Sequence, residues 1–309
     1  MHKPRGKKMA ALGKHYSTTE GKPVVGHSLL QALYVLEGRH CPLAPQLYRQ
    51  QAVCRAEGVP FESKIDLMVS QSEAFRPLSG TLTHVLLDSW FSAKRIWKAA
   101  RSRGFLITTG LKSNRSLRVA DADSPRGWRW QRLSEYAATL TEADYQLMPW
   151  PSQGEEPRQV WVHVVSTRVR KLYRCQVVIV RESLDAPLKE ARFWASSDLE
   201  ADVARLLAHI AARWDVEVLF ADCKELLGLD HYQVMSSTAI VRFWTLALAA
   251  YAFLDEERDR LRQEWKRHIT IGDARREVQR VHWCHLIDWM HQQFQQGATP
   301  QIVSKRLAA

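Results

Sequence analysis

Three residues in the second half of the chain are spaced in a way that could serve phosphate chemistry. Arg213, Glu217 and Lys224 lie four and then seven residues apart. Because an α-helix turns by about 100° per residue, this spacing places the three side chains along one helical face. A carboxylate between two cations could hold a metal ion or grip a phosphate group. The same pattern is also typical of a solvent-exposed ion-pair face on an amphipathic helix.

A second acid, Asp88, ends the short apolar run HVLLD, which is typical of a buried parallel strand. The basic helical pattern SAKRIWKAARSRG and a second apolar run, FLITTG, follow it. Strand, helix and strand in this order predict a βαβ unit, and in such sheets ligands bind at the carboxyl ends of the strands. Asp88 is therefore a candidate site residue. It could instead cap the following helix, a role that Ser89 or Ser92 could equally fill.

The composition indicates a globular protein with a polyanionic partner. The 309 residues are 46% apolar and 25% charged, and the formal net charge is +11. A basic surplus of this size favours nucleic acid as the partner. Five cysteines without a CxxC pair indicate reduced thiols in a cytoplasmic protein.

No membrane partner is expected from the apolar segments. The first residues are basic and polar and have no apolar core like that of a signal peptide. The longest apolar run, residues 239–254, contains Arg242 and is shorter than the roughly 20 residues that a membrane span needs. We therefore expect this run to form a buried core helix.

The elements around the candidate residues can be sketched from periodicity and turn residues. Residues 22–43 predict a strand pair, residues 45–60 a loop, and residues 62–75 a helix. Residues 115–195 predict a β-rich insertion that includes an antiparallel hairpin of QVWVHVV and YRCQVVIVRE. The loops of this insertion carry five cations, which form either a phosphate-backbone surface or an ordinary solvated hairpin: Arg158, Arg168, Arg170, Lys171 and Arg174.

The helix that carries Glu217 is expected to begin near residue 197 and to run to Gly228. Ser197 or Asp198 would be its N-cap, and Gly228 stands where a helix typically ends. Other acids are rival site candidates, but one would be a cap and two would face solvent on the helix: Asp198, Asp215 and Asp222.

Together these residues resemble the DDE transposases of bacterial insertion sequences, a branch of the RNase H-like polynucleotidyl transferases. One large group carries a helical signature of Tyr, two residues, Arg, three residues, Glu, six residues and Lys. Arg213, Glu217 and Lys224 stand at that spacing, whereas Ile210 occupies the tyrosine position. The segment LGLDHYQ resembles the LGL-x-x-Y-Q tail of the signature, and the segment that begins HVLLD resembles the one with the second Asp. The resemblance extends from Lys3 to about Leu254.

The resemblance implies a fold and a division of the chain. The fold class would be α/β, an RNase H-like mixed sheet flanked by helices, with a β-rich insertion before the acidic helix and a helical C-terminal region. Four segments are expected: residues 1–114 as the first part of the catalytic domain, 115–195 as the insertion, 196–255 as its completion, and 256–309 as the charged helical region.

The resemblance also implies an activity and a site. Asp88 and Glu217 would be catalytic carboxylates that bind Mg²⁺ (or Mn²⁺), a cation that prefers hard oxygen ligands. Arg213, Lys224, Lys112 and Arg115 would contact DNA. The expected function is DNA transposition by metal-dependent strand cleavage and transfer, on double-stranded DNA at insertion-sequence ends and target. The protein would act as a multimer in the bacterial cytoplasm, associated with the nucleoid.

One member of the family's acid set has no counterpart in the sequence. The first catalytic Asp of such enzymes precedes a stretch similar to HKPRGKKMAALGKHYS, and that stretch begins at the first residues here. We therefore expect an N-terminally truncated transposase whose polypeptide alone has little or no strand-cleavage activity. The alternative is an inactive remnant that only binds DNA or an intact transposase.

Overall fold

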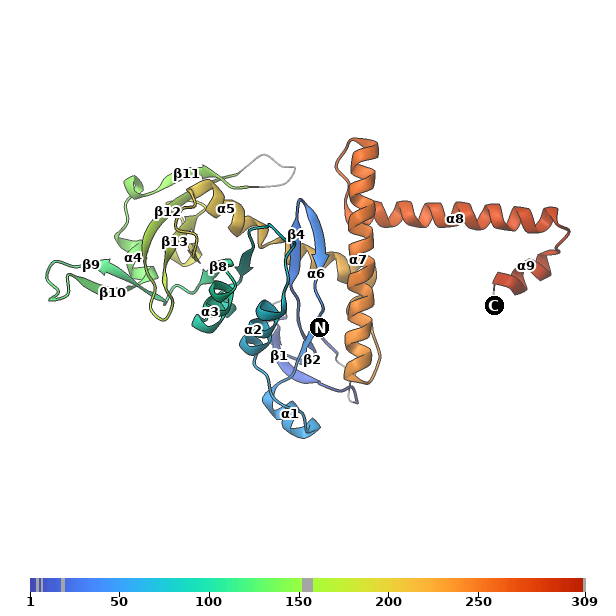
Figure 1. Ribbon diagram of the computed structural model, residues 1–309, viewed down its shortest axis with the longest axis horizontal. Helices are drawn as coiled ribbons and strands as arrows, with labels where there is room; N and C mark the ends of the chain where they lie inside the picture. The colour runs from blue at the N-terminus through green and yellow to red at the C-terminus, as the bar shows by residue number, and fades with distance from the viewer. Residues whose placement is uncertain (4–5, 7, 18–19, 152–157, 308–309) are drawn as a thin grey trace. The chain divides into compact units, whose positions relative to one another are not determined.

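The computed structural model describes residues 1–3, 6, 8–17, 20–151 and 158–307. The chain forms two compact units. Unit 1 comprises Met1–Leu30 and Gln46–Glu217, and unit 2 comprises Gln31–Pro45 and Val218–Ala309. Figure 1 labels the elements of both units.

A six-stranded mixed sheet organises unit 1. Its strand order is β11 (Gln146–Pro149), β12 (Gln159–Arg168), β13 (Arg174–Arg181), β14 (Arg192–Ser196), β8 (Leu106–Leu111) and β7 (His84–Leu87). Only β7 and β8 are parallel to each other among these neighbours, and α3 (Lys94–Ser102) connects them. The predicted βαβ unit, the predicted hairpin and the mixed α/β class are confirmed. The β-rich segment extends the same sheet, because β14 pairs directly with β8.

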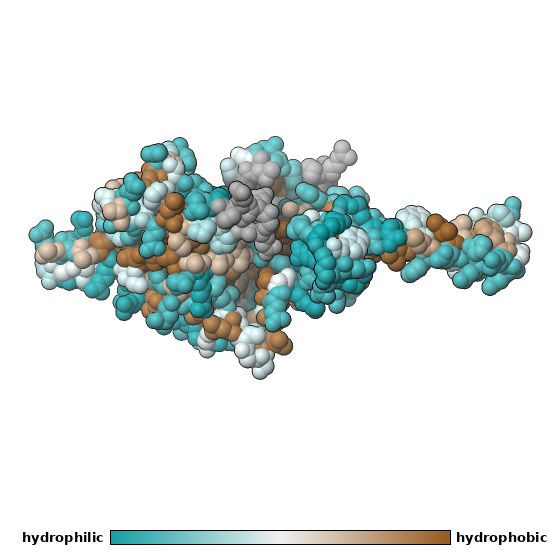
Figure 2. Space-filling model, turned by 90° about the horizontal axis from the view of Figure 1, so that it is seen from above, coloured by the Kyte–Doolittle hydropathy of each residue, from teal (hydrophilic) through white to brown (hydrophobic). Residues whose placement is uncertain are grey.

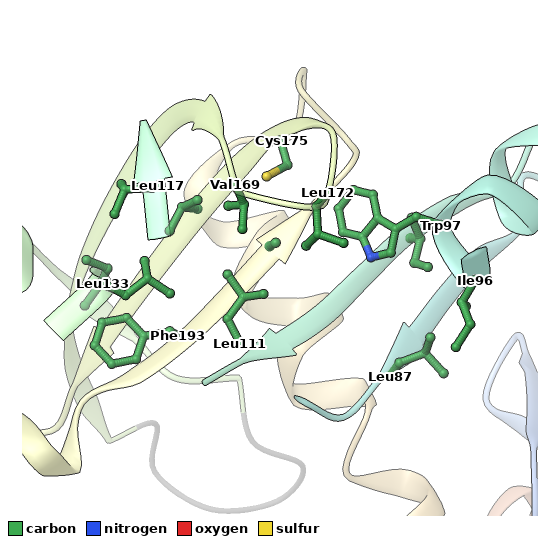
Figure 3. Packing of buried hydrophobic residues seen from close by; sticks show 14 of the residues in the cluster. Leu87, Ile96, Trp97, Leu111, Leu117, Leu133, Val169, Leu172, Cys175 and Phe193 are labelled. Carbon is green, nitrogen blue, oxygen red and sulfur yellow. The ribbon is translucent and has the colours of Figure 1, made fainter. Parts of the chain in front are cut away.

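The first face of the sheet carries the larger apolar core, shown in Figure 3. Helix α3 contributes Ile96 and Trp97, whose side chains are fully buried, and α4 (Leu133–Thr139) contributes Leu133. These side chains belong to one buried cluster with Leu111 and Phe193 of the sheet, and in Figure 3 Leu133 lies near Phe193. The cations of α3 lie between its apolar positions, so the basic helix predicted from the sequence is an amphipathic helix of the core.

The second face is covered by α5 (Val203–Ala212), which buries Leu206, Leu207 and Ile210 against valines of β12 and β13. The expected single helix from residue 197 is wrong. Asp202 is the N-cap of α5, where its carboxylate accepts the Arg205 N–H at 2.8 Å. A separate helix, α6 (Asp215–Leu227), follows.

The reason for the later helix start is a contact across the sheet. The Gln176 side-chain amide on β13 donates to the carbonyls of Asp198 and Ala201, at 3.0 and 2.8 Å. These bonds hold the backbone of residues 198–201 against β13, and this segment is not helical. The other end is as predicted: Gly228 has a φ of 62°, the left-handed conformation that ends many helices.

The N-terminal part of unit 1 consists of short elements. Two hairpin-like pairs, β1 (Gly13–Ser17) with β2 (Lys22–Gly26) and β3 (Ser28–Leu30) with β6 (Gln46–Tyr48), precede two helices. The helices are α1 (Gln51–Glu57) and α2 (Lys64–Ala74). The predicted helix over 62–75 is confirmed, and a capping box between Ser63 and Asp66 begins it.

The predicted loop over 45–60 is wrong, since that stretch holds β6 and α1. The polar composition of this stretch favoured a loop. In the structure Cys54 is buried and Gly58, in the left-handed conformation, ends α1. Unit 1 also contains the strands β9 (Ser116–Ala120) and β10 (Trp128–Arg132) and three short 3₁₀ turns, η1 (Ser89–Phe91), η2 (Glu142–Asp144) and η3 (Leu188–Glu190).

Unit 2 is built on one long helix. Its elements are the hairpin of β4 (Leu33–Leu36) and β5 (Arg39–Pro42), the part of α6 from Val218 onward, and the helices α7 (Ser237–Trp265), α8 (Ile271–Gln295) and α9 (Pro300–Leu307). Helix α7 continues beyond the expected 239–254, through the charged residues that follow.

By length and composition alone, α7 could cross a membrane. Its buried positions recur at helical spacing from Ile240 to Leu261 and include two charged residues, Asp255 and Arg258. These two form an ion pair at 2.7 Å, and Asp255 also accepts the backbone N–H of His40 on β5 at 2.9 Å. A buried stripe that contains paired charges and a strand contact fits a helix that packs against protein.

Among the described residues, α8 is buried only near its start, and near its other end Gln293 accepts a hydrogen bond from Arg306 of α9. Of its 25 residues, Ile271 and Ala274 are buried. Three large apolar side chains further along are exposed: Trp283, Ile287 and Phe294. Figure 2 shows hydrophobic residues among hydrophilic ones along α8 and α9, at the right of the view.

Candidate active site

Asp88 lies directly after the edge strand β7 and is exposed. Its Oδ1 accepts the backbone N–H of Trp90 at 2.8 Å and so caps the 3₁₀ turn η1. The capping role considered from the sequence is therefore real, although it falls on η1 and not on α3, whose N-cap residue, Ala93, makes no side-chain cap bond. Capping uses one carboxylate oxygen and leaves the other available for a further ligand.

The chain after Asp88 turns onto the second face of the sheet. A methyl group added to Gly110 on β8 would lie 3.0 Å from Ser89 N, so the backbone of η1 passes over this glycine. Gly110 is paired with Trp194 of β14, and directly opposed residues share a face. Trp194 packs in the cluster under α5. The absence of a side chain at Gly110 therefore allows the Asp88 turn to approach the α5 side of the sheet.

Arg213 and Glu217 lie on this same side, but they do not share a helix: Arg213 is the C-cap residue of α5, in the turn before α6, and Glu217 lies in the first turn of α6. The expected single helical face of Arg213, Glu217 and Lys224 is therefore wrong, because the turn at residues 213–214 separates the two helices. The Arg213 guanidinium is 5.7 Å from the ring centres of both Trp194 and Trp214, and its side chain is only 16% exposed. It pairs with Glu217 at 2.7 Å, and that carboxylate is 42% exposed. The ion pair expected from the four-residue spacing is present. It is anchored to the sheet through Trp194, which a merely solvated helix face would not be.

A short series of neighbours thus leads from one candidate acid to the other. Ser89, the residue after Asp88, passes over Gly110, and Gly110 is paired with Trp194 on the next strand. The Trp194 ring contacts Arg213, which forms the ion pair with Glu217. The Asp88 turn and the Arg213–Glu217 pair therefore lie on the α5 side of the sheet, next to the paired residues Gly110 and Trp194. In the described ranges, no three or more His, Cys, Asp or Glu side chains are grouped closely enough to hold a metal ion.

The three other candidate cations differ in their surroundings. Lys112 is exposed, and its ammonium lies 5.0 Å from the ring centre of Trp90 in η1. Arg115 donates to the carbonyl and the hydroxyl of Ser92, and so holds the end of the turn that follows Asp88. Lys224 is exposed and lies two turns beyond Glu217 on α6, with its ammonium 5.9 Å from the Phe220 ring centre.

A lysine that the sequence analysis did not select lies near Asp88. The Lys64 ammonium lies 5.1 Å from the ring centre of Tyr48. Burial lowers the pKa of Lys64, and the Asp88 carboxylate acts in the opposite direction and raises it. Lys64 is therefore a cation close enough to Asp88 for the two charges to interact. Only the fold brings the start of α2 to the end of β7, so no local pattern could have identified it.

A buried polar cluster also lies under the candidate site. The His84 ring is 3.9 Å from the His209 ring, and His84 Nε2 is 2.8 Å from the Thr108 hydroxyl, which donates to Ser196 at 2.9 Å. Burial, followed by the nearby His209, lowers the pKa of His84 to about 3. His84 is four residues before Asp88 on the same strand face, an alternation visible in the sequence.

Two rival acids differ from their predicted surroundings. Asp198 was expected to be a helix cap, but it is 6% exposed and pairs with Arg205 at 3.4 Å. Asp222 was expected to face solvent, but burial, followed by the charge of Glu225, raises its pKa. Those expectations are wrong because α5 begins later than predicted and α6 buries more of its surface.

Comparison with protein families matches residues 48–253, more than half of the chain, to the transposase DDE domain. The chain belongs to this family, whose fold is RNase H-like. Its members are transposases, which act on DNA as nucleases and strand transferases and in general use a divalent metal ion. No curated protein matches the sequence.

Proposed function

We propose that this protein acts in DNA transposition by metal-dependent cleavage and transfer of strands at insertion-sequence ends. The observation that supports this most is the placement of Asp88 and Glu217 on one side of the sheet, joined through Gly110, Trp194 and Arg213. The sequence signature of Arg213, Glu217 and Lys224 favours the insertion-sequence group with that helical pattern.

Asp88 and Glu217 would hold the metal ion. Both offer carboxylate oxygens, the donors that Mg²⁺ (or Mn²⁺) prefers. When bound, such an ion would activate the attacking oxygen and stabilise the leaving one. Arg213 fixes the direction of the Glu217 carboxylate, because its guanidinium is itself held against Trp194 and Trp214. The cap bond to Trp90 fixes Asp88 in the same way.

The cations would act on DNA in two ways. Lys112 and Lys224 are exposed and would contact phosphates of the double-stranded substrate. Arg115 and Arg213 are engaged with Ser92 and Glu217, so they would position the acids while offering their remaining N–H groups to phosphate. We further propose that the protein works as a multimer on paired DNA ends, without a membrane partner, in the bacterial cytoplasm.

A second function is favoured by one observation. The described residues bring no three acids together, whereas the family resemblance implies a set of three catalytic carboxylates. In this alternative the 309-residue polypeptide by itself would cleave DNA weakly or not at all. It would then bind DNA, or an intact transposase, without processing the ends.

Metal binding tests the site separately from activity. Mn²⁺ titration followed by electron paramagnetic resonance should show a bound ion that Glu217→Gln and Asp88→Asn each weaken at least tenfold. Glu225→Gln removes an exposed acid from the same helix and should leave the affinity unchanged. Equal binding by all four proteins would remove Asp88 and Glu217 from the site.

Strand cleavage separates the two functions. Labelled duplexes of the genomic DNA that flanks the coding sequence are incubated with protein and Mg²⁺. Nicking that Glu217→Gln abolishes would support the transposase and contradict the proposal of weak activity. DNA binding with no nicking would favour the non-processing alternative.

A further inference from the structure

A two-stranded ribbon leaves the sheet of unit 1 directly after β8 and extends at the left of Figure 1. Its strands β9 and β10 are antiparallel, and Trp130 lies directly opposite Arg118. Five residue pairs are in register, and the turn between the strands spans residues 121–127. Strands in such a ribbon lie about 5 Å apart, which is narrower than the major groove of DNA, about 12 Å wide.

The two faces of the ribbon have different environments. Leu117 and Val119 point to one face and pack on the apolar core of unit 1. Arg129 is opposite Val119 and shares that face. Because side chains alternate along a strand, four others share the outer face: Arg118, Trp128, Trp130 and Arg132.

Trp128 is a platform for two cations. The Arg118 guanidinium lies 4.7 Å from its ring centre, and that of Arg126, from the turn, lies 5.9 Å from it. Trp130 packs edge-on against the same indole, with ring centres 5.5 Å apart. An aromatic ring attracts a guanidinium and restricts its rotamers while its N–H groups stay accessible. The outer face therefore presents two pre-oriented arginines.

The arginines of the ribbon differ in whether an acid neutralises them. Arg129, on the inner face, pairs with Asp121 at 3.7 Å, and Arg132 pairs with Glu135 at 3.8 Å. Throughout the part of the chain that the structure describes, Arg118 and Arg126 have no ion-pair partner. A guanidinium group that lies over an indole ring and has no carboxylate beside it is suited to bind an external anion.

The base of the ribbon is joined to a second basic segment. Leu117 forms a bridge with Val169, and the Arg170 N–H donates to the Ser116 carbonyl at 2.8 Å. This contact places the ribbon beside the turn between β12 and β13. The turn and the adjoining strand ends carry four exposed cations: Arg168, Arg170, Lys171 and Arg174. They belong to the five loop cations for which the sequence left two alternatives open, a phosphate-backbone surface or a solvated hairpin.

We propose that the outer face of the β9–β10 ribbon binds double-stranded DNA, with Arg118 and Arg126 on phosphates and Trp128 holding both arginines in place. The ribbon and the neighbouring turn form one surface, and the ribbon is narrow enough to follow the major groove. This inference rests on the proposed function only in taking DNA as the partner. It assigns phosphate contacts at a surface separate from the predicted acids.

Fluorescence anisotropy with a labelled duplex of about 30 base pairs, at several salt concentrations, tests the proposal. Each phosphate contact contributes about 0.9 to the slope of log affinity against log salt. The double variant Arg118→Ala/Arg126→Ala should bind about tenfold more weakly at 50 mM salt, with a slope smaller by about 1.8. Trp128→Ala should lose about threefold with the slope unchanged, because both charges remain but are no longer pre-oriented.

Arg129→Ala is the matched control, because it removes the same charge from the opposite face of the same ribbon. It should stay within about twofold of the unsubstituted protein. Circular dichroism spectra and melting temperatures establish that the variants are folded. Equal losses for Arg129→Ala and the double variant, or none for either, would overturn the proposal. So would a loss confined to single-stranded DNA, or an equal loss on vesicles of anionic lipid.

The result is distinguishable from a failure of the proposed function. If the unsubstituted protein binds no DNA, both the proposed function and the assignment of DNA binding to the ribbon fail. If it binds DNA and the double variant binds equally well, the ribbon assignment alone fails. The Mn²⁺ titration of the Asp88 and Glu217 variants is unaffected by either outcome.

Discussion

The two faces of the sheet in unit 1 bury different kinds of side chain. The first face is apolar around Trp97 and Phe193, and the ribbon packs on it through Leu117 and Val119. The second face combines an apolar cluster under α5 with the polar groups His84, Thr108 and Ser196. The apolar face supplies stability and supports the basic ribbon, whereas the second face accepts buried polar groups next to the predicted acids.

The faces also use arginine and tryptophan differently. Arg213 lies against two indoles on the second face, but its charge is directed to Glu217. Arg118 lies against Trp128 on the ribbon, where its charge faces outward. The same packing therefore orients a carboxylate in one place and leaves a cation for DNA in the other. Four predictions, from the largest expected effect to the smallest, test this contrast.

Truncating one tryptophan on each face should separate stability from metal binding. Trp97→Ala should lower the free energy of unfolding by about 4 kcal/mol, because that side chain is fully buried. Trp194→Ala should cost about 2 kcal/mol, since it is only partly buried, but it should weaken Mn²⁺ binding because Arg213 loses its support. Chemical denaturation and Mn²⁺ titration measure the two effects. Equal Mn²⁺ affinity for the two variants would contradict the contrast between the two faces of the sheet.

A methyl group at Gly110 should disturb the second face alone. Gly110→Ala places Cβ 3.0 Å from Ser89 N, so the Asp88 turn must move, at a cost of about 2 kcal/mol. Both the Mn²⁺ affinity and the stability should fall, whereas the affinity of the ribbon for duplex DNA should stay unchanged. Gly272→Ala is the control, because the nearest atom to its added Cβ is 3.6 Å away and alanine favours helix by about 1 kcal/mol. An unchanged Mn²⁺ affinity in Gly110→Ala would contradict the predicted role of this close approach.

The histidines of the second face should make stability depend on pH. Burial lowers the pKa of both His84, to about 3, and His209, so both are neutral in the folded protein near pH 7. The unfolded chain takes up protons near pH 6.5 and the folded chain does not, so stability is lost as the pH falls below about 6.5 towards 3.

Between pH 7 and pH 5, His84→Gln should reduce this loss by about 1 kcal/mol in urea unfolding. The nearby Asp198 raises the pKa of both rings and Arg205 lowers it, so neither reverses the direction. The pKa values of His15 and His27 are also lowered by burial, so part of the pH slope should remain in the variant. An identical slope in both proteins would exclude His84 as a source.

The smallest effect concerns the ion pair itself. A double-mutant cycle of Arg213→Met and Glu217→Gln should give a coupling free energy of about 0.5 kcal/mol, because the carboxylate is 42% exposed. The corresponding cycle for Arg129 and Asp121 should give a smaller value, since Arg129 is 60% exposed and its contact is 3.7 Å long. A larger coupling for the ribbon pair would reverse the proposed contrast between the faces.

Sequence patterns identified the elements whose signals are local. The run HVLLD, the amphipathic α3 and FLITTG are contiguous, so their periodicity was enough to predict the parallel β7–α3–β8 unit. The capping residues around Ser63 and the left-handed Gly58 are equally local signals. The loop predicted over residues 45–60 was nevertheless wrong, because α1 lies within that stretch and Gly58 ends it. The polar composition of that stretch favoured the prediction of a loop, although burial of Cys54 stabilises a short helix there.

Contacts distant in sequence could not be predicted in the same way. The late start of α5 depends on Gln176, which lies on a strand more than twenty residues earlier. His84 stacks on His209, and Gly110 is paired with Trp194, only because the sheet and α5 bring them together. Local periodicity contains no information on which strands are neighbours, so these relationships were not available from the sequence.

The sequence by itself determined the family, the spacing of Arg213, Glu217 and Lys224, and the acid at the end of the β7 strand. Those features follow from residue identity and from the fixed geometry of helices and strands. Only the tertiary structure decided which face of the sheet each group occupies and which arginine has an acid beside it. Those properties depend on strand register and on packing between distant segments, which the three-dimensional fold alone establishes.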